Sequence, residues 1–249
     1  MRLILKDATF FKKCVDAIGA LVDEAEFILR DDGLFLKATD PSQISMVDFS
    51  IEKKAFETFD IKEQTKIGID LDYFGQILGR AKAGDSLELS FDDNRTKLNT
   101  IFSGSAKRAF EVPLIDVSSG ELPSPKIDFD AELAVSSGDI MDGIKDALLI
   151  STHITLGVDA EHFFIRANSS KGKLNNQIKL ADKKVITSFK AKNEAKATFP
   201  LDYLRDMVKG AASDVPVTLK LKTNAPVSIS YKIGEASINY FLAPRIESE

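Results

Sequence analysis

Apolar residues recur along this chain with two different spacings, and each spacing predicts one type of secondary structure. Between residues 10 and 22 they return every third or fourth position, while lysine and aspartate fall mostly on the opposite arc. This spacing is typical of an amphipathic helix. A second helix is predicted from Leu71 to about Ala81, with Asp70 as its N-cap, because a carboxylate can accept a hydrogen bond from the first turn.

Elsewhere apolar and polar residues alternate, which indicates strands that bury one face. Leu34 and Leu36 are spaced in this way, and the Asp32-Gly33 dipeptide just before them predicts a hairpin turn. Antiparallel strands joined by such turns, with a helix laying its apolar stripe on one face of the sheet, form an α+β domain.

The same pattern occurs twice in the chain. The tripeptide Leu-Asp-Tyr at 71–73 recurs at 201–203, and similar apolar positions follow each copy. The alternating run at 87–91 has its counterpart at 217–221, at the same offset of 130 residues. Matches in the same order at a constant offset indicate an internal duplication. The predicted fold class is therefore α+β, with two similar duplicated domains of mainly antiparallel sheet and two helices each.

Punctuation residues support this division. In the second copy, Pro200 stands where a helix begins and Gly210 where it ends. The segment 118–126 is rich in serine, glycine and proline, as linkers are. We predict an N-terminal domain at 1–117, a connecting linker at 118–126 and a C-terminal domain at 127–249.

Composition limits the classes of function. The 249 residues are 44% hydrophobic, enough for one large or two ordinary cores, and the single cysteine, Cys14, excludes an intrachain disulfide. The N-terminus does not read as a signal peptide and no apolar run has the length of a membrane span, so we expect a soluble, intracellular protein without a membrane role. The net charge of −5 argues against holding nucleic acid by overall charge.

Motifs of catalysis are missing from the sequence. His153 and His162 lie in no metal-binding frame, Cys14 falls on the apolar face of its helix, and there is no P-loop, dinucleotide fingerprint or CxxC pair. We expect no catalytic residue, no cofactor and no metal. One alternative stays open, a duplicated two-domain enzyme with convergent carboxylates, for which Asp72 and Asp202 would be the candidates.

Basic residues gather in or just after the four predicted helices. They are Lys12, Lys13, Arg80, Lys82, Lys145, Arg205 and Lys209. Each could simply be a solvated charge. If all four helices faced the same way, these side chains would form a local positive surface that contacts phosphates without reading bases.

Several segments together carry a resemblance to a known family. They are the residues at 21–25, 40–45, 71–83, 114–117 and 203–210, and the ending Tyr240-Phe241-Leu242-Ala243-Pro244-Arg245-Ile246-Glu247. The chain resembles the archaeal and eukaryotic DNA sliding clamps, the proliferating cell nuclear antigen family, over essentially its whole length. The resemblance implies a trimeric ring that encircles double-stranded DNA as a processivity factor in DNA replication and DNA repair, with the seven basic residues facing the channel.

The resemblance also implies two further surfaces. Subunits would pair edge strands at about 109–115 and 175–181, through Phe110, Val112, Leu114, Ile178 and Leu180. Partner proteins would insert a hydrophobic peptide into a pocket at Gln43, Ile44, Met46, Leu122, Pro123, Pro226, Phe241, Ala243, Pro244 and Ile246. The implied partners are DNA polymerase, flap endonuclease, DNA ligase and the clamp loader.

The sequence departs from the family pattern at some of these surfaces. Gly19, Gln76, Gly79 and Asp142 stand where relatives often carry basic side chains, which predicts a less positive channel and DNA contact that is weaker or more salt-sensitive. Thr39 and Ser119 replace larger apolar residues beside the pocket, which would be shallower there. A specialised subunit of a heterotrimeric clamp is an open alternative to a homotrimer. The compartment would be the cytoplasm or nucleoid of an archaeon, or the nucleus of a eukaryote.

Overall fold

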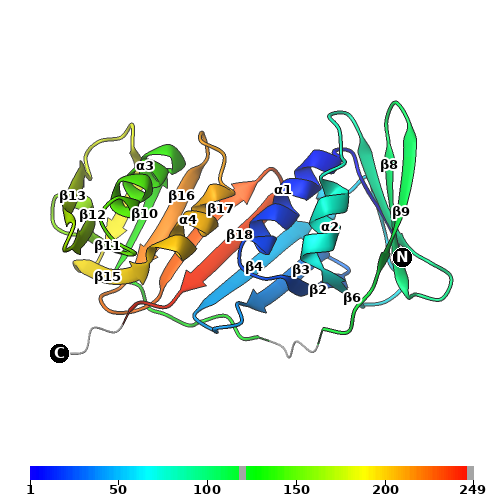
Figure 1. The fold of residues 1–249 in the computed structure, drawn as a ribbon, viewed down its shortest axis with the longest axis horizontal. Helices are drawn as coiled ribbons and strands as arrows, with labels where there is room; N and C mark the ends of the chain where they lie inside the picture. Colours follow the sequence, from blue (N-terminus) through cyan, green and yellow to red (C-terminus); the bar gives the residue numbers. More distant parts are fainter. Residues whose placement is uncertain (118–121, 246–249) are drawn as a thin grey trace. The chain divides into compact units, whose positions relative to one another are not determined.

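The structure, a computed structural model, describes residues 1–117 and 122–245 (Figure 1). The chain divides into two compact units that are not contiguous in sequence. One unit is mostly N-terminal but includes 233–238, and the other is mostly C-terminal but includes 42–46. We describe them below as the N-terminal and C-terminal halves, and a strand that contributes residues to both units is grouped with its neighbours in the chain. The predicted domain boundaries remain a prediction.

The N-terminal half consists of short antiparallel strands and two α-helices within the described residues. The elements are β1 (Arg2–Leu5), α1 (Ala8–Gly19), β2 (Glu24–Arg30), β3 (Gly33–Thr39), β4 (Ser45–Glu52), the 3-10 turn η1 (Lys53–Ala55), β5 (Thr58–Asp60), β6 (Thr65–Asp70), α2 (Leu71–Leu78), β7 (Ser86–Phe91), β8 (Lys97–Ser103) and β9 (Lys107–Pro113). The strands form a sheet in the order β5-β1-β7-β8-β9 and a second run in the order β4-β3-β2-β6.

The C-terminal half repeats this plan. Its elements are β10 (Ala131–Ser136), α3 (Ser137–Leu148), β11 (His153–Val158), β12 (His162–Ser169), β13 (Gly172–Lys179), β14 (Ile186–Ala191), β15 (Ala195–Pro200), α4 (Leu201–Lys209), β16 (Pro216–Leu221), β17 (Val227–Ile233) and β18 (Ala236–Leu242). One sheet has the order β13-β12-β11-β15, and a further run has the order β14-β10-β16-β17-β18. The α+β fold class and its duplication are thereby confirmed.

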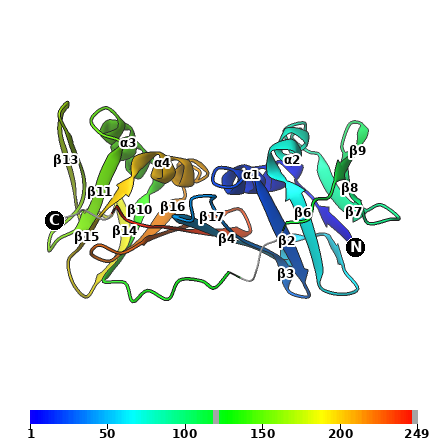
Figure 2. The same cartoon turned by 60° about the horizontal axis from the view of Figure 1, so that its bottom comes forward.

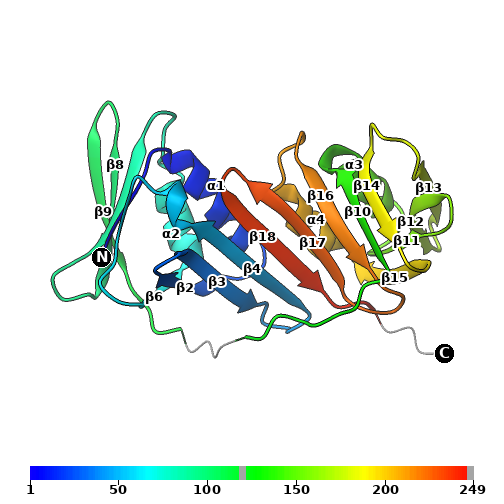
Figure 3. The same cartoon turned by 180° about the vertical axis from the view of Figure 1, so that it is seen from behind.

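The two helices of each half contact each other and cover the same side of their own strands (Figure 2). Turned around, each half shows its strands in front and its helices behind (Figure 3). The apolar stripe of α1 is buried, with Phe11, Val15 and Ile18 at most 2% exposed. Burying such stripes is the main favourable contribution to folding.

Local signals explain most of the helix ends. The Asp70 carboxylate accepts a hydrogen bond of 2.9 Å from the Tyr73 amide, so the predicted N-cap of α2 is confirmed. The predicted end at about Ala81 is wrong, because α2 ends at Leu78. After Leu78 the chain tightens, and the Arg80 amide donates to the Ile77 carbonyl at 2.9 Å, three residues back. Such a bond closes a turn rather than extending an α-helix.

The predicted hairpin turn at Asp32-Gly33 joins β2 to β3. A side chain at Gly33 would place its Cβ 2.2 Å from the Ile51 carbonyl oxygen, so the sheet requires glycine there for steric reasons. The first helix spans residues 8–19 rather than 10–22, because the apolar pattern continues into the connection where Val22 is buried.

Candidate functional site

The basic residues predicted in the N-terminal half lie on α1 and in the turn after α2. Lys13 is exposed, and Lys12 forms an ion pair with Asp16 one helical turn on. Arg80 and Lys82 are exposed in the segment between α2 and β7. All belong to the helix-bearing side of this half, where the apolar stripe faces the sheet and leaves the opposite arc to charged residues.

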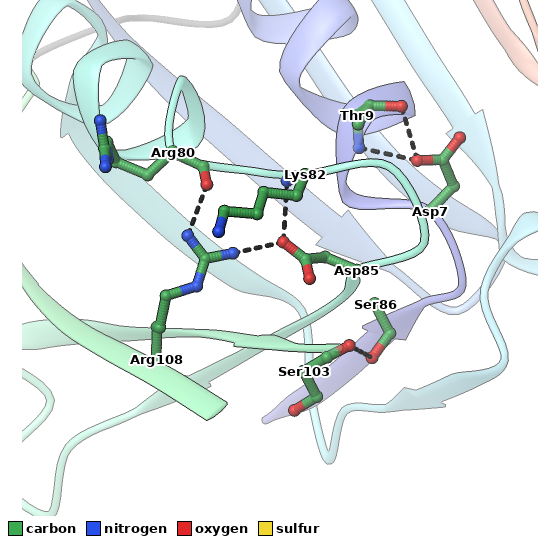
Figure 4. Close-up of polar contacts among 8 residues, drawn as sticks. All are labelled: Asp7, Thr9, Arg80, Lys82, Asp85, Ser86, Ser103 and Arg108. Carbon is green, nitrogen blue, oxygen red and sulfur yellow. Dashed lines mark hydrogen bonds and ion pairs between the residues drawn. The ribbon is translucent and has the colours of Figure 1, made fainter. Parts of the chain in front are cut away.

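The turn that carries Arg80 and Lys82 is held by one carboxylate (Figure 4). Asp85 accepts a hydrogen bond of 2.8 Å from the Lys82 amide and forms an ion pair with Arg108 of β9. The Arg108 guanidinium also donates to the Arg80 carbonyl at 2.6 Å. The backbone at both basic residues is thereby fixed to a neighbouring strand.

The three basic residues predicted in the C-terminal half lie together. Lys145, Arg205 and Lys209 line one groove of about 500 Å³ between α3 and α4. Lys145 pairs with Asp142 at 3.0 Å. These positions share a groove because α3 and α4 pack side by side.

Arg205 is bound by two aspartates of its own helix. Its guanidinium contacts Asp202 at 2.8 Å and Asp206 at 2.9 Å. The hydrogen bond that the Arg205 guanidinium donates to Asp206 raises the pKa of Arg205, with smaller contributions from the charges of both carboxylates. The Arg205 charge is partly satisfied within the helix, and a phosphate would compete with these carboxylates for it.

Each predicted pairing segment contains the edge strand of a sheet. β9 ends the sheet β5-β1-β7-β8-β9, and β13 ends the sheet β13-β12-β11-β15. Phe110, Leu114 and Ile178 are half-buried, whereas Val112 is fully buried in its own half. The last, Leu180, follows β13 and is 9% exposed. Within the described residues, each edge therefore has no strand partner along one side, and such an edge is a template for adding a strand.

Exposed leucines at the end of α3 escaped the sequence analysis. Leu149 is 74% exposed and Leu148 is 38% exposed. The Ser169 hydroxyl donates to the Ile150 carbonyl at 2.5 Å, which places this apolar segment beside the turn between β12 and β13. The signal was a run of three apolar residues, 148–150, that exceeds the width of one helical stripe.

Two residues of the predicted peptide pocket are joined by a hydrogen bond just after the last strand. The Ala243 amide donates to the Ile44 carbonyl at 2.8 Å, within the C-terminal half. Gln43 is exposed with φ of 57°, and Phe241 is 9% exposed, so most of its side chain packs inside its own half. Four other residues of the predicted pocket are half-buried, namely Met46, Pro226, Ala243 and Pro244.

Two predicted pocket residues fall elsewhere, and a third lies outside the described residues. Leu122 lies in the other compact unit and lines a groove of about 540 Å³ on the strand face opposite α1 and α2. Pro123 is exposed. Ile246 lies outside the described residues, as does Ser119.

Comparisons with known proteins agree with this geometry. Family models of the N-terminal and C-terminal domains of the proliferating cell nuclear antigen match residues 1–120 and 124–246. The DNA polymerase sliding clamp of Methanococcus vannielii is 36% identical over 245 residues, 96% of each chain. That of Thermofilum pendens is 34% identical and covers 99% of this chain and 100% of its own. This chain belongs to the proliferating cell nuclear antigen family.

Solved structures of the family have the same fold. A structure described as "C-terminal region of FEN-1 bound to A. fulgidus PCNA" has a TM-score of 0.88 at 32% identity, covering 100% of this chain and 99% of that one. The clamp of Thermococcus kodakaraensis has a TM-score of 0.93 at 22% identity, covering 98% and 99%, and supports the fold alone.

The histidines and the cysteine of this family member lie in structural surroundings. Cys14 is fully buried, and burial raises the pKa of its thiol. Burial, followed by the charge of Arg245, lowers the pKa of His153. Among residues 1–117 and 122–245, no cluster of three or more histidine, cysteine, aspartate or glutamate side chains is suited to a metal ion. No helix in those ranges has the length and apolarity needed to cross a membrane.

The two aspartates of the enzyme alternative have ordinary helical positions. Asp72 and Asp202 each lie in the first turn of a helix, where a negative charge is favourable. Asp202 is already paired with Arg205. They belong to different compact units.

Proposed function

We propose that this protein is a DNA polymerase sliding clamp, a non-enzymatic ring that encircles duplex DNA and tethers replication and repair proteins to it. The observation that carries the proposal is that both halves present the same layered unit, with basic side chains on the helices and an unpaired strand at one sheet edge. Helical cations contact the DNA backbone without reading its sequence. Backbone contacts of this kind allow sliding.

Ring closure follows from the two edges. β9 of one copy adds to β13 of the next, which joins the sheets of successive subunits head to tail. Phe110 and Leu114 on one edge meet Ile178 and Leu180 on the other. Leu149, beside β13, adds apolar area to this contact. Three copies close the ring, as is usual for the family.

A separate surface recruits partners. The segment after β18 and the residues at 43–46, which belong to one compact unit, form the floor of a pocket for a hydrophobic peptide. The FEN-1 region bound to the A. fulgidus relative supports this proposal. By the same reasoning, polymerase, flap endonuclease, DNA ligase and the clamp loader are the partners. The protein acts in the compartment that holds the DNA, the nucleoid of an archaeon or the nucleus of a eukaryote.

Retention on circular DNA tests encirclement. Loaded by a clamp loader onto a closed circle, the protein stays bound through gel filtration at moderate salt. Linearising the circle with a restriction enzyme lets the protein slide off. As a control, an enzyme that cuts only free competitor DNA, and not the circle, leaves the protein bound. Equal retention on closed and linearised DNA contradicts encirclement, because only a topological link depends on closure.

The mass of the protein in solution separates the two ring types. A homotrimer of this 27.4 kDa chain runs at three times that mass when expressed alone. A monomer that trimerises only with other clamp chains indicates a heterotrimer subunit instead.

A further inference from the structure

Asp85 is a buried charge to which DNA encirclement and partner binding assign no role. It is 3% exposed. Its backbone carbonyl accepts from the Ala8 amide at 2.8 Å, at the first residue of α1. Its carboxylate accepts from the Lys82 amide and pairs with Arg108, as Figure 4 shows. One residue thus joins the start of α1, the turn after α2 and the edge strand β9.

Arg108 extends this connection from Asp85 to the aromatic residues of the edge sheet. Its guanidinium bonds the Asp85 carboxylate and the Arg80 carbonyl, and lies over the Phe102 ring at 5.2 Å. Phe102 in turn packs edge-on against Phe110, with ring centroids 5.9 Å apart. The Arg108 side chain fixes the Arg80–Lys82 turn and also contacts Phe102. Phe102 in turn contacts Phe110, which belongs to the proposed subunit contact.

The hairpin between β8 and β9 leaves room for the Asp85 carboxylate. A Cβ on Gly104 would lie 2.1 Å from an Asp85 carboxylate oxygen, so glycine leaves the space that the charge occupies. A buried ion pair contributes little to stability relative to apolar packing, because both charges lose water. The pair is therefore better explained by the geometry that it imposes than by the energy that it adds.

The second copy of the duplication lacks this device. At the offset of 130 residues, Val215 replaces Asp85 and Ala212 replaces Lys82. The turn is kept, since the Val215 amide donates to the Ala212 carbonyl at 2.9 Å, as the Asp85 amide does to Lys82 at 3.0 Å. A turn of this shape forms without a carboxylate. The charge is therefore an addition in the half that carries the β9 edge.

We propose that Asp85 is a positioning residue that couples the subunit edge to the turn presenting Arg80 and Lys82 to DNA. This inference rests on the proposed function, both for the subunit contact at β9 and for the DNA contact at Arg80 and Lys82. Seating of β9 against the next subunit holds Arg108, and Arg108 and Asp85 together hold the backbone at residues 80 and 82. Coupling between two sites is reciprocal, so DNA in contact with the turn also strengthens ring closure.

Hydrogen exchange tests the hold on the turn without reference to DNA. Asp85→Asn keeps an oxygen for the Lys82 amide but loses the ion pair with Arg108. We expect amides 80–84 to exchange about tenfold faster in the trimer, within the usual range of such couplings. Asp92→Asn is the matched control, because Asp92 bonds Thr96 and Lys97 at another hairpin. Unchanged exchange at 80–84 in Asp85→Asn overturns the proposal.

A double-mutant cycle tests the coupling itself. In the wild-type background, Arg80→Ala with Lys82→Ala weakens retention on circular DNA, and in the Asp85→Asn background the same pair has a much smaller effect. A purely structural role for Asp85 gives additive losses instead, which overturns the proposal. Arg108→Lys, which keeps the charge but cannot make both bonds, serves if Asp85→Asn fails to fold.

The cycle also separates this inference from the proposed function. If Arg80→Ala with Lys82→Ala leaves retention unchanged in the wild type, the DNA contact of this turn is wrong and the coupling falls with it. If Arg80→Ala with Lys82→Ala weakens retention in the wild type, and Asp85→Asn alone weakens it to a similar extent while trimers persist, encirclement stands and Asp85 supports it by positioning the turn.

Discussion

The two halves of the molecule share a buried pattern and differ in the charge of their helices. α1 carries two lysines and one aspartate, whereas α3 carries three aspartates and one lysine. In α4, two aspartates balance one arginine and one lysine. Duplication has preserved the residues that pack and has let the exposed charges diverge, because packing constrains every buried methylene while a solvated charge has many alternatives.

The difference bears on how the ring meets DNA. In the C-terminal half, Arg205 and Lys145 are engaged by aspartates of their own helices. In the N-terminal half, Arg80 and Lys82 sit on a turn whose backbone is fixed from the side by Asp85 and Arg108. We infer that the DNA backbone is contacted more strongly by the turn after α2 than by the basic residues of α3 and α4.

The largest effects are expected where the halves are alike. Phe74 of α2 and Leu204 of α4 occupy the same repeat position, and each is 1% exposed. Alanine at either site leaves a cavity and lowers the free energy of unfolding by about 3 kcal/mol. Urea denaturation followed by circular dichroism measures both variants. If one of them leaves stability unchanged, the two cores are not equivalent.

The edges are where one half must recognise the other on a neighbouring copy. Ile178→Asp places a charge on the half-buried face of β13. Because burying an unpaired charge is costly, we expect the dissociation constant of the trimer to rise about a hundredfold. Gln177→Asp, next in sequence on the exposed face, is the control and leaves the trimer intact. Sedimentation at graded concentrations distinguishes them, and equal effects contradict the proposed pairing.

Charge removal from the helices sharpens the contrast between halves. Arg80→Ala with Lys82→Ala, in the turn after α2, is expected to weaken binding of duplex DNA about tenfold and to lower its salt dependence, as lost phosphate contacts do. Lys145→Ala with Lys209→Ala has a smaller effect, because Asp142 already engages Lys145. Affinity measured across a salt series tests this order, and equal losses would refute the asymmetry.

The smallest effect concerns helix starts. Asp7 caps α1 by accepting from the Thr9 amide at 2.8 Å, whereas α4 follows Pro200 without a side-chain cap. Asp7→Ala lowers stability by about 1 kcal/mol, the usual value of a cap, while Asp7→Asn retains most of it.

The same cap has a pH dependence with a defined sign. Hydrogen bonding from the Thr9 hydroxyl, the largest cause, lowers the pKa of Asp7 in the folded protein. A lowered pKa gives a contribution that is present above the unfolded-state pKa and is lost as pH falls through the folded-state pKa. Thermal unfolding from neutral to acidic pH therefore shows a smaller acid loss in Asp7→Ala than in the wild type. A parallel profile would exclude Asp7 from this dependence.

Local patterns sufficed for the elements and for the duplication. Helical spacing found α1 and α2, Asp70 marked a cap, and Asp32-Gly33 marked a turn, because each depends on residues close in sequence. The end of α2 was misplaced by three residues, since the backbone tightens after Leu78 to meet β7 and β9. That contact joins segments far apart in the chain.

By itself, the sequence determined that the chain is a duplicated α+β protein, where its basic residues cluster, and that it resembles the clamp family. Periodicity, turn residues and family segments can be read directly from the order of residues in the chain. Only the tertiary structure decided that β9 and β13 end their sheets, that Arg205 is held by its own helix, and that Asp85 meets Arg108. Edges and ion pairs are set by which distant strands and side chains fold together, and no local spacing records that choice.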